Sequence, residues 1–177
     1  MTEPPHARSF ARDLAEGRAD AYAELYDRLG PAMLRVARTM LLRQDRAEDV
    51  VQDVFVGLTR SRTDFTTVED IDAYVFTALR HAATARLIRD RKYERHQQDI
   101  AQNAAQQPAK RPPESSEELD TALAQLPAEQ REVIALKIDG DLTFAQIAHV
   151  LNISPNTAAS RYRYALEKLR HALEDKK

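Results

Sequence analysis

A helix-turn-helix pattern near the C-terminus is the feature that most constrains how this chain can fold. Thr143 and Gln146 have the spacing of a capping box, which starts a helix. Ser154 can cap a second helix, and Pro155 suits its first position, where no backbone donor is needed. A short turn at Asn152 separates the two helix signals. The pattern therefore predicts two helices that pack closely against each other.

The second of these helices has an apolar side and a polar side. Helical spacing predicts that its apolar side consists of Ala158, Tyr162, Ala165, Leu166 and Leu169. The residues that face outward or sideways are then Asn156, Thr157, Ser160, Arg161, Arg163 and Tyr164. Short polar side chains with arginines behind them suit base edges and phosphates. We therefore predict a DNA-binding helix; the alternative is an ordinary helical hairpin with a solvated polar side.

The composition favours an all-α fold. The 177 residues include four glycines and no cysteine, which excludes disulfides and cysteine-rich zinc sites and is compatible with a reducing cytoplasm. No apolar run approaches the roughly 20 residues that span a membrane, and the first residues lack the layout of a signal peptide. The net charge of −2 argues against a uniformly basic nucleic-acid binder, so local charge matters more.

Apolar periodicity divides the chain into two helical blocks and a linker. In the first block we expect helices over 9–17, 19–29, 31–42, from about 45, and from 70 to about 95. A polar loop precedes the last of these. The stretch 97–116 is rich in glutamine and alanine, contains three prolines and lacks an apolar stripe, which predicts a flexible linker. We thus expect two small helical domains, with boundaries at 1–18 (N-terminal segment), 19–96, 97–116 (linker) and 117–177.

The helix expected from about residue 45 carries an acidic face opposite its apolar stripe. The face consists of Asp45, Glu48, Asp49, Gln52 and Asp53. Acidic residues in a first helical turn are favoured by the helix dipole. Asp53 lies beyond that turn, so the face is longer than capping requires. It is either a docking surface or an ordinary solvated face.

The long helix expected after residue 70 ends in a basic cluster. Arg80, Arg86, Arg89, Arg91, Lys92 and Arg95 oppose only Asp90 and Glu94, a local excess of 6 − 2 = +4. Such a cluster can neutralise phosphates. Candidate stacking partners for bases within or beside it are Tyr74, Phe76, His81 and Tyr93. The alternative is a positive helix end that is stabilised by the helix dipole.

Four segments in this order resemble an extracytoplasmic-function (group 4) sigma factor of bacterial RNA polymerase. Residues 21–38 resemble the opening of that family's domain 2. The segment Ala47-Glu-Asp-Val-Val-Gln-Asp-Val-Phe-Val-Gly-Leu58 resembles its clamp-binding motif, which implies that the acidic face contacts the polymerase. Residues 70–91 resemble the segment that opens and reads the minus-10 element. Residues 126–136 and the helix-turn-helix resemble domain 4, which reads the minus-35 element.

The resemblance also implies individual binding residues. For the minus-10 element these are Tyr74, Arg80, His81, Thr84, Arg86, Arg89, Arg91 and Lys92. For the minus-35 element they are the outward-facing residues 156, 157, 160, 161, 163 and 164 of the second helix. The chain departs from the family where His81 replaces an asparagine and Ala85 an aspartate, so the minus-10 base preference is expected to differ.

The implied partners are bacterial core RNA polymerase, promoter DNA and an anti-sigma factor, in the cytoplasm. We expect no enzymatic activity, cofactor or metal, because the five histidines are scattered and no glycine-rich phosphate loop is present. One alternative is a stand-alone helix-turn-helix regulator, which would leave the acidic face and the long basic helix without a role. Another is a polymerase-binding adaptor without promoter activity.

Overall fold

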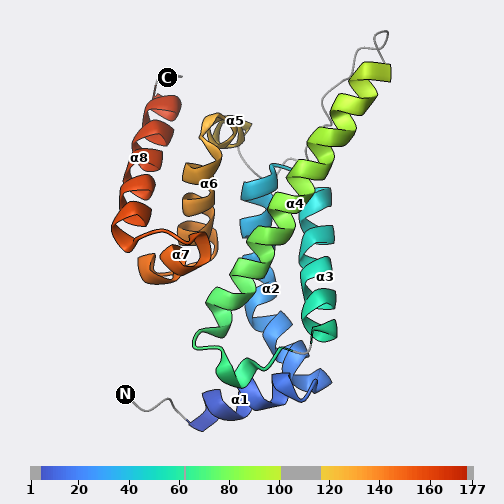
Figure 1. Ribbon diagram of the computed structural model, residues 1–177. Coiled ribbons are helices and arrows are strands. Elements are labelled where there is room, and N and C mark those ends of the chain that lie inside the picture. The colour runs from blue at the N-terminus through green and yellow to red at the C-terminus, as the bar shows by residue number, and fades with distance from the viewer. Residues whose placement is uncertain (1–4, 62, 101–116, 175–177) are drawn as a thin grey trace.

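A computed structural model of the chain describes residues 5–61, 63–100 and 117–174. Its elements are α1 (Pro5–Ala15), α2 (Ala19–Leu41), α3 (Gln44–Arg60), η1 (Phe65–Thr67), α4 (Ile71–Ile100), α5 (Glu117–Gln125), α6 (Ala128–Ile134), η2 (Ala135–Asp139), α7 (Phe144–Leu151) and α8 (Pro155–Glu174). The element η1 is a 3-10 turn, and η2 is a short π-helix that continues α6. The N-terminal block is α1 to α4, and the C-terminal block is α5 to α8 (Figure 1). Every regular element in the described ranges is helical, so the predicted all-α fold is confirmed.

A single helix, α2, replaces the two helices expected on either side of Gly30 and Pro31. The prediction of a break was wrong because both halves bury apolar side chains in the same core, including Leu25 and Met33. Proline inside a helix removes one backbone hydrogen bond and costs about 3 kcal/mol. Burial along 23 residues outweighs that cost, and the ring of Pro31 lies on the exposed side.

The expected long helix is present as α4, and it begins at a side-chain cap. The Oδ1 atom of Asp70 accepts a hydrogen bond from the backbone N–H of Ala73 at 2.8 Å. The loop before it contains η1, whose Phe65 is completely buried although the sequence pattern did not indicate a core residue there. α4 continues to Ile100, so it includes the first four residues of the predicted linker. The rest of that linker, 101–116, lies outside the described residues.

The helix-turn-helix is formed by α7 and α8 as predicted. Thr143 and Gln146 make both hydrogen bonds of the capping box. Ser154 Oγ accepts a hydrogen bond from the backbone N–H of Thr157 at 3.0 Å and so caps α8. Asn152, with φ at +52°, makes the left-handed turn that ends α7. Local chemistry is sufficient to determine this motif.

The apolar side of α8 is narrower than its periodicity predicted. Ala158, Ala165 and Leu169 are buried, but Leu166 is 39% exposed, so its predicted inward position was wrong. Consecutive helical residues are rotated by about 100°. Leu166 is therefore turned away from the surface that Ala165 makes with the rest of the block, because only one side of α8 is covered.

The two blocks pack against each other and share one hydrophobic core. Helices α2 and α4 of the N-terminal block contact η2, α6 and α7 of the C-terminal block. The core runs without interruption from Met33 and Val36 on α2 to Leu136, Leu142 and Ile147 on the C-terminal side. In Figure 1, α6, α7 and α8 lie on one side of α4, and α3 lies on the other. The open face of the N-terminal block is therefore the one formed by α2 and α3.

Candidate functional site

The acidic face predicted on α3 lies at the molecular surface. Asp45, Glu48, Asp49, Gln52 and Asp53 are all exposed. A hydrogen bond from Arg43 lowers the pKa of Asp45, and Asp49 Oδ2 lies 3.5 Å from Arg86 Nη1 on α4. Within the described part of the chain, neither Glu48 nor Asp53 has an ion-pair partner. These two residues therefore supply the available negative charge of the face.

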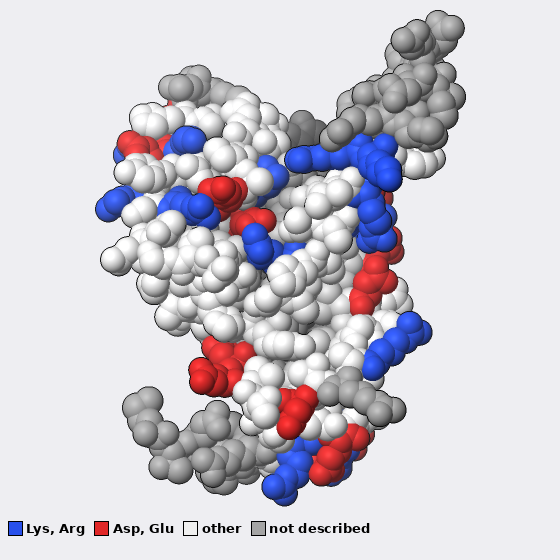
Figure 2. Space-filling model, viewed as in Figure 1, with Lys and Arg blue, Asp and Glu red and all other residues white. Residues whose placement is uncertain are grey.

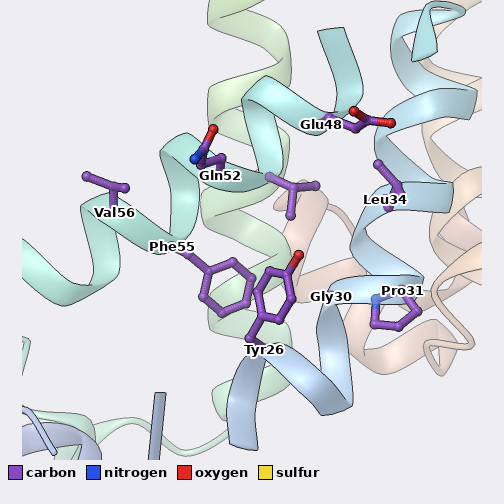
Figure 3. Close-up of a pocket in the computed structure, with 9 residues that line it drawn as sticks. Tyr26, Gly30, Pro31, Leu34, Glu48, Gln52, Phe55 and Val56 are labelled. Atoms are coloured by element: carbon purple, nitrogen blue, oxygen red, sulfur yellow. The ribbon is translucent and has the colours of Figure 1, made fainter. Parts of the chain in front are cut away.

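Beside the acidic face, a groove of about 740 Å³ lies between α2 and α3 (Figure 3). It is lined by Tyr26, Gly30, Pro31, Leu34, Glu48, Val51, Gln52, Phe55 and Val56. The rings of Tyr26 and Phe55 pack edge to face, with centroids 4.9 Å apart. Tyr26 is 52% exposed and Val56 is 39% exposed, so the groove leaves a sizeable apolar surface open.

Two of the predicted acidic-face residues, Glu48 and Gln52, form the polar rim of this groove. Figure 3 shows Glu48 at one end, near Leu34, and the two aromatic rings at the other end. An apolar trough with a polar edge can accept one side of an amphipathic helix. The sequence analysis missed the α2 side of the groove because it expected a helix break at Pro31. A clue was available in Tyr26 and Leu34, which are eight residues apart and so lie on similar helix faces.

The basic cluster of α4 is less positive than its sequence suggested. The Nε atom of Arg80 lies 3.3 Å from the Glu132 carboxylate of α6. Arg86 pairs with Asp49 at 3.5 Å and with Asp90 at 3.4 Å, and Asp90 also pairs with Arg46. Two of the expected phosphate-binding arginines are thus neutralised within the molecule, which corrects the predicted free excess of four charges.

The positive charge that stays open lies nearer the C-terminal end of α4. Arg89, Arg91 and Lys92 are exposed, and Figure 2 shows Lys and Arg side chains gathered on this part of the surface. Burial lowers the pKa of Arg131 on α6; Glu132 opposes this effect, and the positive charge of Arg91 adds to it. The end of α4 and the C-terminal block therefore present like charges to each other.

The candidate stacking residues of α4 have different environments. His81 is exposed and Tyr93 is 64% exposed, so both rings are accessible to a base. Tyr74 is half-buried, its hydroxyl lies 3.1 Å from Thr63 Oγ1, and its ring packs against Phe65. Phe76 is 1% exposed and belongs to the core, so its prediction as a stacking partner was wrong. Its helical position faces inward, next to Val75 and Leu79 rather than next to His81. Thr84 is half-buried.

The residues predicted to bind DNA on α8 come together on its first three turns. Asn156, Arg163 and Tyr164 are exposed, whereas Thr157, Ser160 and Arg161 are half-buried. The Arg161 Nη2 atom pairs with Glu129 Oε2 at 2.5 Å. The guanidinium of Arg163 lies over the Tyr164 ring, 5.7 Å from its centroid. Arg163 is therefore the more available of the two arginines for a phosphate.

Comparison with known families assigns both blocks. The family described as "Sigma-70 region 2" matches residues 25–94, and the one described as "Sigma-70, region 4" matches residues 116–169. The chain belongs to the extracytoplasmic-function sigma factors. Region 2 contains the acidic face and α4, and region 4 contains the helix-turn-helix, in the order that the sequence resemblance predicted.

Full-length relatives support this assignment. The RNA polymerase sigma factor CarQ of Myxococcus xanthus is 29% identical over 161 residues, which cover 89% of this chain and 92% of CarQ. The ECF RNA polymerase sigma factor SigK of Mycobacterium ulcerans (strain Agy99) is 25% identical and covers 98% of this chain and 99% of SigK.

Two solved structures have a similar fold. CnrH, solved in complex with the cytosolic domain of CnrY, matches with a TM-score of 0.70 and 24% identity over 96% of this chain and 98% of that chain. The sigma factor RpoE, solved with the anti-sigma factor NepR from Bartonella quintana, matches with a TM-score of 0.71 and 24% identity over 88% and 98%.

The family assignment determines the class of activity. This sigma factor directs RNA polymerase to promoters at transcription initiation, and the polymerase carries out the chemistry. The prediction of a non-enzymatic factor is confirmed by the family. A stand-alone helix-turn-helix regulator is excluded, because that class does not account for region 2.

Proposed function

We propose that this sigma factor docks on core RNA polymerase through the groove between α2 and α3, with Glu48 and Asp53 as its charged contacts. The exposed residues of α4 would read the minus-10 element, and the first turns of α8 would read the minus-35 element. The proposed domain boundaries are 19–96 for domain 2, 97–116 for the linker and 117–177 for domain 4. The N-terminal segment, 1–18, contains α1, which packs against η1 and α2.

The observation that carries the docking proposal is the apolar groove with its acidic rim. Tyr26, Phe55 and Val56 supply apolar surface that the rest of the chain leaves open. A helix with an apolar stripe and flanking basic residues would bury that surface and pair with Glu48 and Asp53. The apolar contacts would provide affinity, and the charges would mainly provide association rate and register.

The promoter contacts follow from which side chains are available. His81, Arg89, Arg91 and Lys92 on α4 are exposed and can contact an unstacked base or the backbone. Tyr74, Arg80, Thr84 and Arg86 remain proposed minus-10 contacts, but the first, second and fourth have partners within the chain. On α8, Asn156, Thr157 and Ser160 are proposed to lie nearest the base edges. Arg161, Arg163 and Tyr164 are proposed to lie along the phosphates.

We also propose a cytoplasmic location and control by an anti-sigma factor. None of the helices in the described ranges combines the length and apolarity needed to cross a bilayer. A factor that works on core polymerase has to reach the compartment in which transcription takes place. The complex of RpoE with the anti-sigma factor NepR supports a regulator of this class for this chain as well.

A matched pair of substitutions tests the docking surface. Val56 on the groove and Leu166 on α8 are both 39% exposed, so either can be changed to aspartate at a similar cost in stability. We expect Val56→Asp to weaken binding to core polymerase at least tenfold, measured by a fluorescence titration, and Leu166→Asp to leave it unchanged. Equal core affinity of Val56→Asp and wild type, with normal helical content, would show that the groove is not the docking surface.

A further inference from the structure

The contact between the two blocks is built from specific polar groups as well as from apolar packing. Asp139, at the end of η2, accepts a hydrogen bond from Thr39 Oγ1 at 2.7 Å on Oδ2 and one from Arg35 Nη2 at 3.2 Å on its carbonyl oxygen. On the next helix, Gln146 Nε2 donates to Asp70 Oδ2 at 2.9 Å. These bonds join residues that are 76 to 104 positions apart in the chain.

The backbone of the C-terminal block approaches α2 closely at Gly140. A Cβ atom at this position would lie 3.3 Å from Val36 Cγ2 on α2 and 2.8 Å from the Leu136 carbonyl oxygen. The Gly140 N–H donates to the Ala135 carbonyl oxygen at 3.0 Å, across five residues, as the last bond of the π-helix. The widened turn and the missing side chain together allow the two blocks to touch, and π-helical turns of this kind often occur at functional positions.

The closed arrangement also engages a promoter-binding candidate. The Arg80 side chain is 28% exposed and is held by Glu132, which belongs to the other block. A phosphate would have to displace this carboxylate before it could pair with Arg80. The available positive charge of α4 is therefore lower in the closed arrangement than in a separated one.

The separation of the two promoter elements is incompatible with the closed arrangement. Elements centred near minus 10 and minus 35 are about 25 base pairs apart, which is about 85 Å of straight B-form DNA. In the closed chain, Gln146 touches Asp70, Arg80 lies about 15 Å further along α4, and Asn156 lies at most about 26 Å along the chain from Gln146. Allowing about 10 Å for the two touching side chains, the two DNA-reading segments are at most about 50 Å apart. One closed chain therefore cannot reach both elements.

We propose that the packing of η2 and α7 on α2 and α4 is an autoinhibitory contact, which must open before the sigma factor can engage both promoter elements. The groove between α2 and α3 stays open in the closed form, so polymerase can dock first and promoter engagement follows the opening. The inference rests on the proposed function, because it needs α4 and α8 to be the two DNA-reading helices. Asp139 and Gly140 hold the contact closed, and Glu132 holds Arg80.

The absence of native cysteine makes a direct test possible. In Thr39→Cys/Asp139→Cys, the two thiols are the only ones in the chain, and a short bismaleimide should join them. We expect rapid cross-linking of the free protein. The cross-linked chain should bind core polymerase within twofold of wild type but form promoter complexes at least tenfold less well. Arg28→Cys/Asp72→Cys is the matched control, because these residues form an ion pair between α2 and α4 within one block. Its cross-linked form should retain promoter binding.

A second variant tests the contact without a cross-linker. Asp139→Arg removes the acceptor of Thr39 and places a positive charge beside Arg35, so it should open the closed form and accelerate promoter complex formation a few-fold. The proposal is overturned if the thiol pair does not cross-link, or if the cross-linked chain initiates as well as the uncross-linked one. Should cross-linking also abolish core binding, the rate measured with Asp139→Arg decides. Unchanged core affinity of Val56→Asp would instead contradict the docking surface alone.

Discussion

The two faces of the N-terminal block show how one helix can serve two different contacts. On one side of α2, the C-terminal block covers the apolar surface with Leu136, Gly140 and Leu142. On the other side, the groove toward α3 leaves Tyr26 and Val56 exposed. Both faces are apolar, but the chain satisfies only one of them. An apolar groove of this size that stays open is expected to be a binding surface.

The two faces also differ in how closely the elements approach each other. The covered face depends on a position without a side chain, and its polar groups are paired across the blocks. The open face has half-exposed aromatic rings and two carboxylates without partners in the described part of the chain. The covered face is therefore sensitive to added volume, and the open face to changes of charge or apolar area. The predictions below test this difference.

The largest expected difference is in stability, between two phenylalanines of the N-terminal block. Phe76 is 1% exposed in the core, and Phe55 is half-buried in the groove. Phe76→Ala should lower the free energy of unfolding by about 3–5 kcal/mol, and Phe55→Ala by about 1 kcal/mol. Urea unfolding followed by circular dichroism measures both. Similar losses for the two variants would mean that the groove residue is part of the core.

Two glycines should respond in opposite directions to the same added methyl group. Gly140→Ala places Cβ against Leu136 and Leu142, at 2.8 and 2.9 Å, and should destabilise the protein by about 1–3 kcal/mol. Gly57, on α3, has no atom within 4 Å of the added methyl, so Gly57→Ala should stabilise by up to about 1 kcal/mol through helix propensity. The shift in thermal midpoint measures both effects. A neutral Gly140→Ala would contradict the close approach of the two blocks.

The two arginines of α8 extend the comparison to duplex DNA. Arg163 is exposed, whereas Arg161 already pairs with Glu129. If each contacts one phosphate, Arg163→Ala should reduce the slope of log affinity against log salt by about 0.9, and Arg161→Ala should reduce it less. Titration of holoenzyme on a promoter at several salt concentrations measures the slopes. An identical slope for Arg163→Ala and wild type would exclude a phosphate contact at that residue.

Two aspartates distinguish the free and the paired parts of the acidic face. Asp53 has no ion-pair partner among the described residues, and Asp49 lies 3.5 Å from Arg86. Asp53→Asn should slow association with core polymerase several-fold at low salt, and Asp49→Asn should have a smaller effect because its charge is already partly neutralised. Stopped-flow association at two ionic strengths checks the order. The reverse order would show that the pair with Arg86 opens on docking.

The smallest effect is expected at His81, which is exposed on α4. A neutral histidine offers one donor and one acceptor, as asparagine does, and adds a face for stacking. His81→Ala should reduce open-complex formation a few-fold without changing core affinity. His81→Asn should preserve opening and alter the preferred minus-10 base. Permanganate footprinting on a set of promoter variants reports both properties. If both substitutions behave as wild type, base capture lies elsewhere on α4.

The sequence predicted the elements that depend on local chemistry. The capping box at Thr143, the cap at Ser154 and the long helix after Asp70 are all present, because caps and apolar periodicity act within a few residues. The acidic face of α3 is exposed as predicted, because alternating apolar and polar positions determine which side of a helix is buried. The order of the motifs also identified the family, which the comparisons confirmed.

Tertiary structure decided what depends on contacts between distant residues. Pro31 lies inside a continuous helix, and Phe76 lies in the core, because burial against other helices outweighs local preference and selects the inward direction. The groove exists only where α2 and α3 meet, and the charge of Arg80 is reduced only because Glu132, 52 residues away, lies beside it. Periodicity describes one helix at a time, and it contains no information on which faces meet. The open docking face and the covered promoter-reading face therefore become distinguishable only once the helices are packed together.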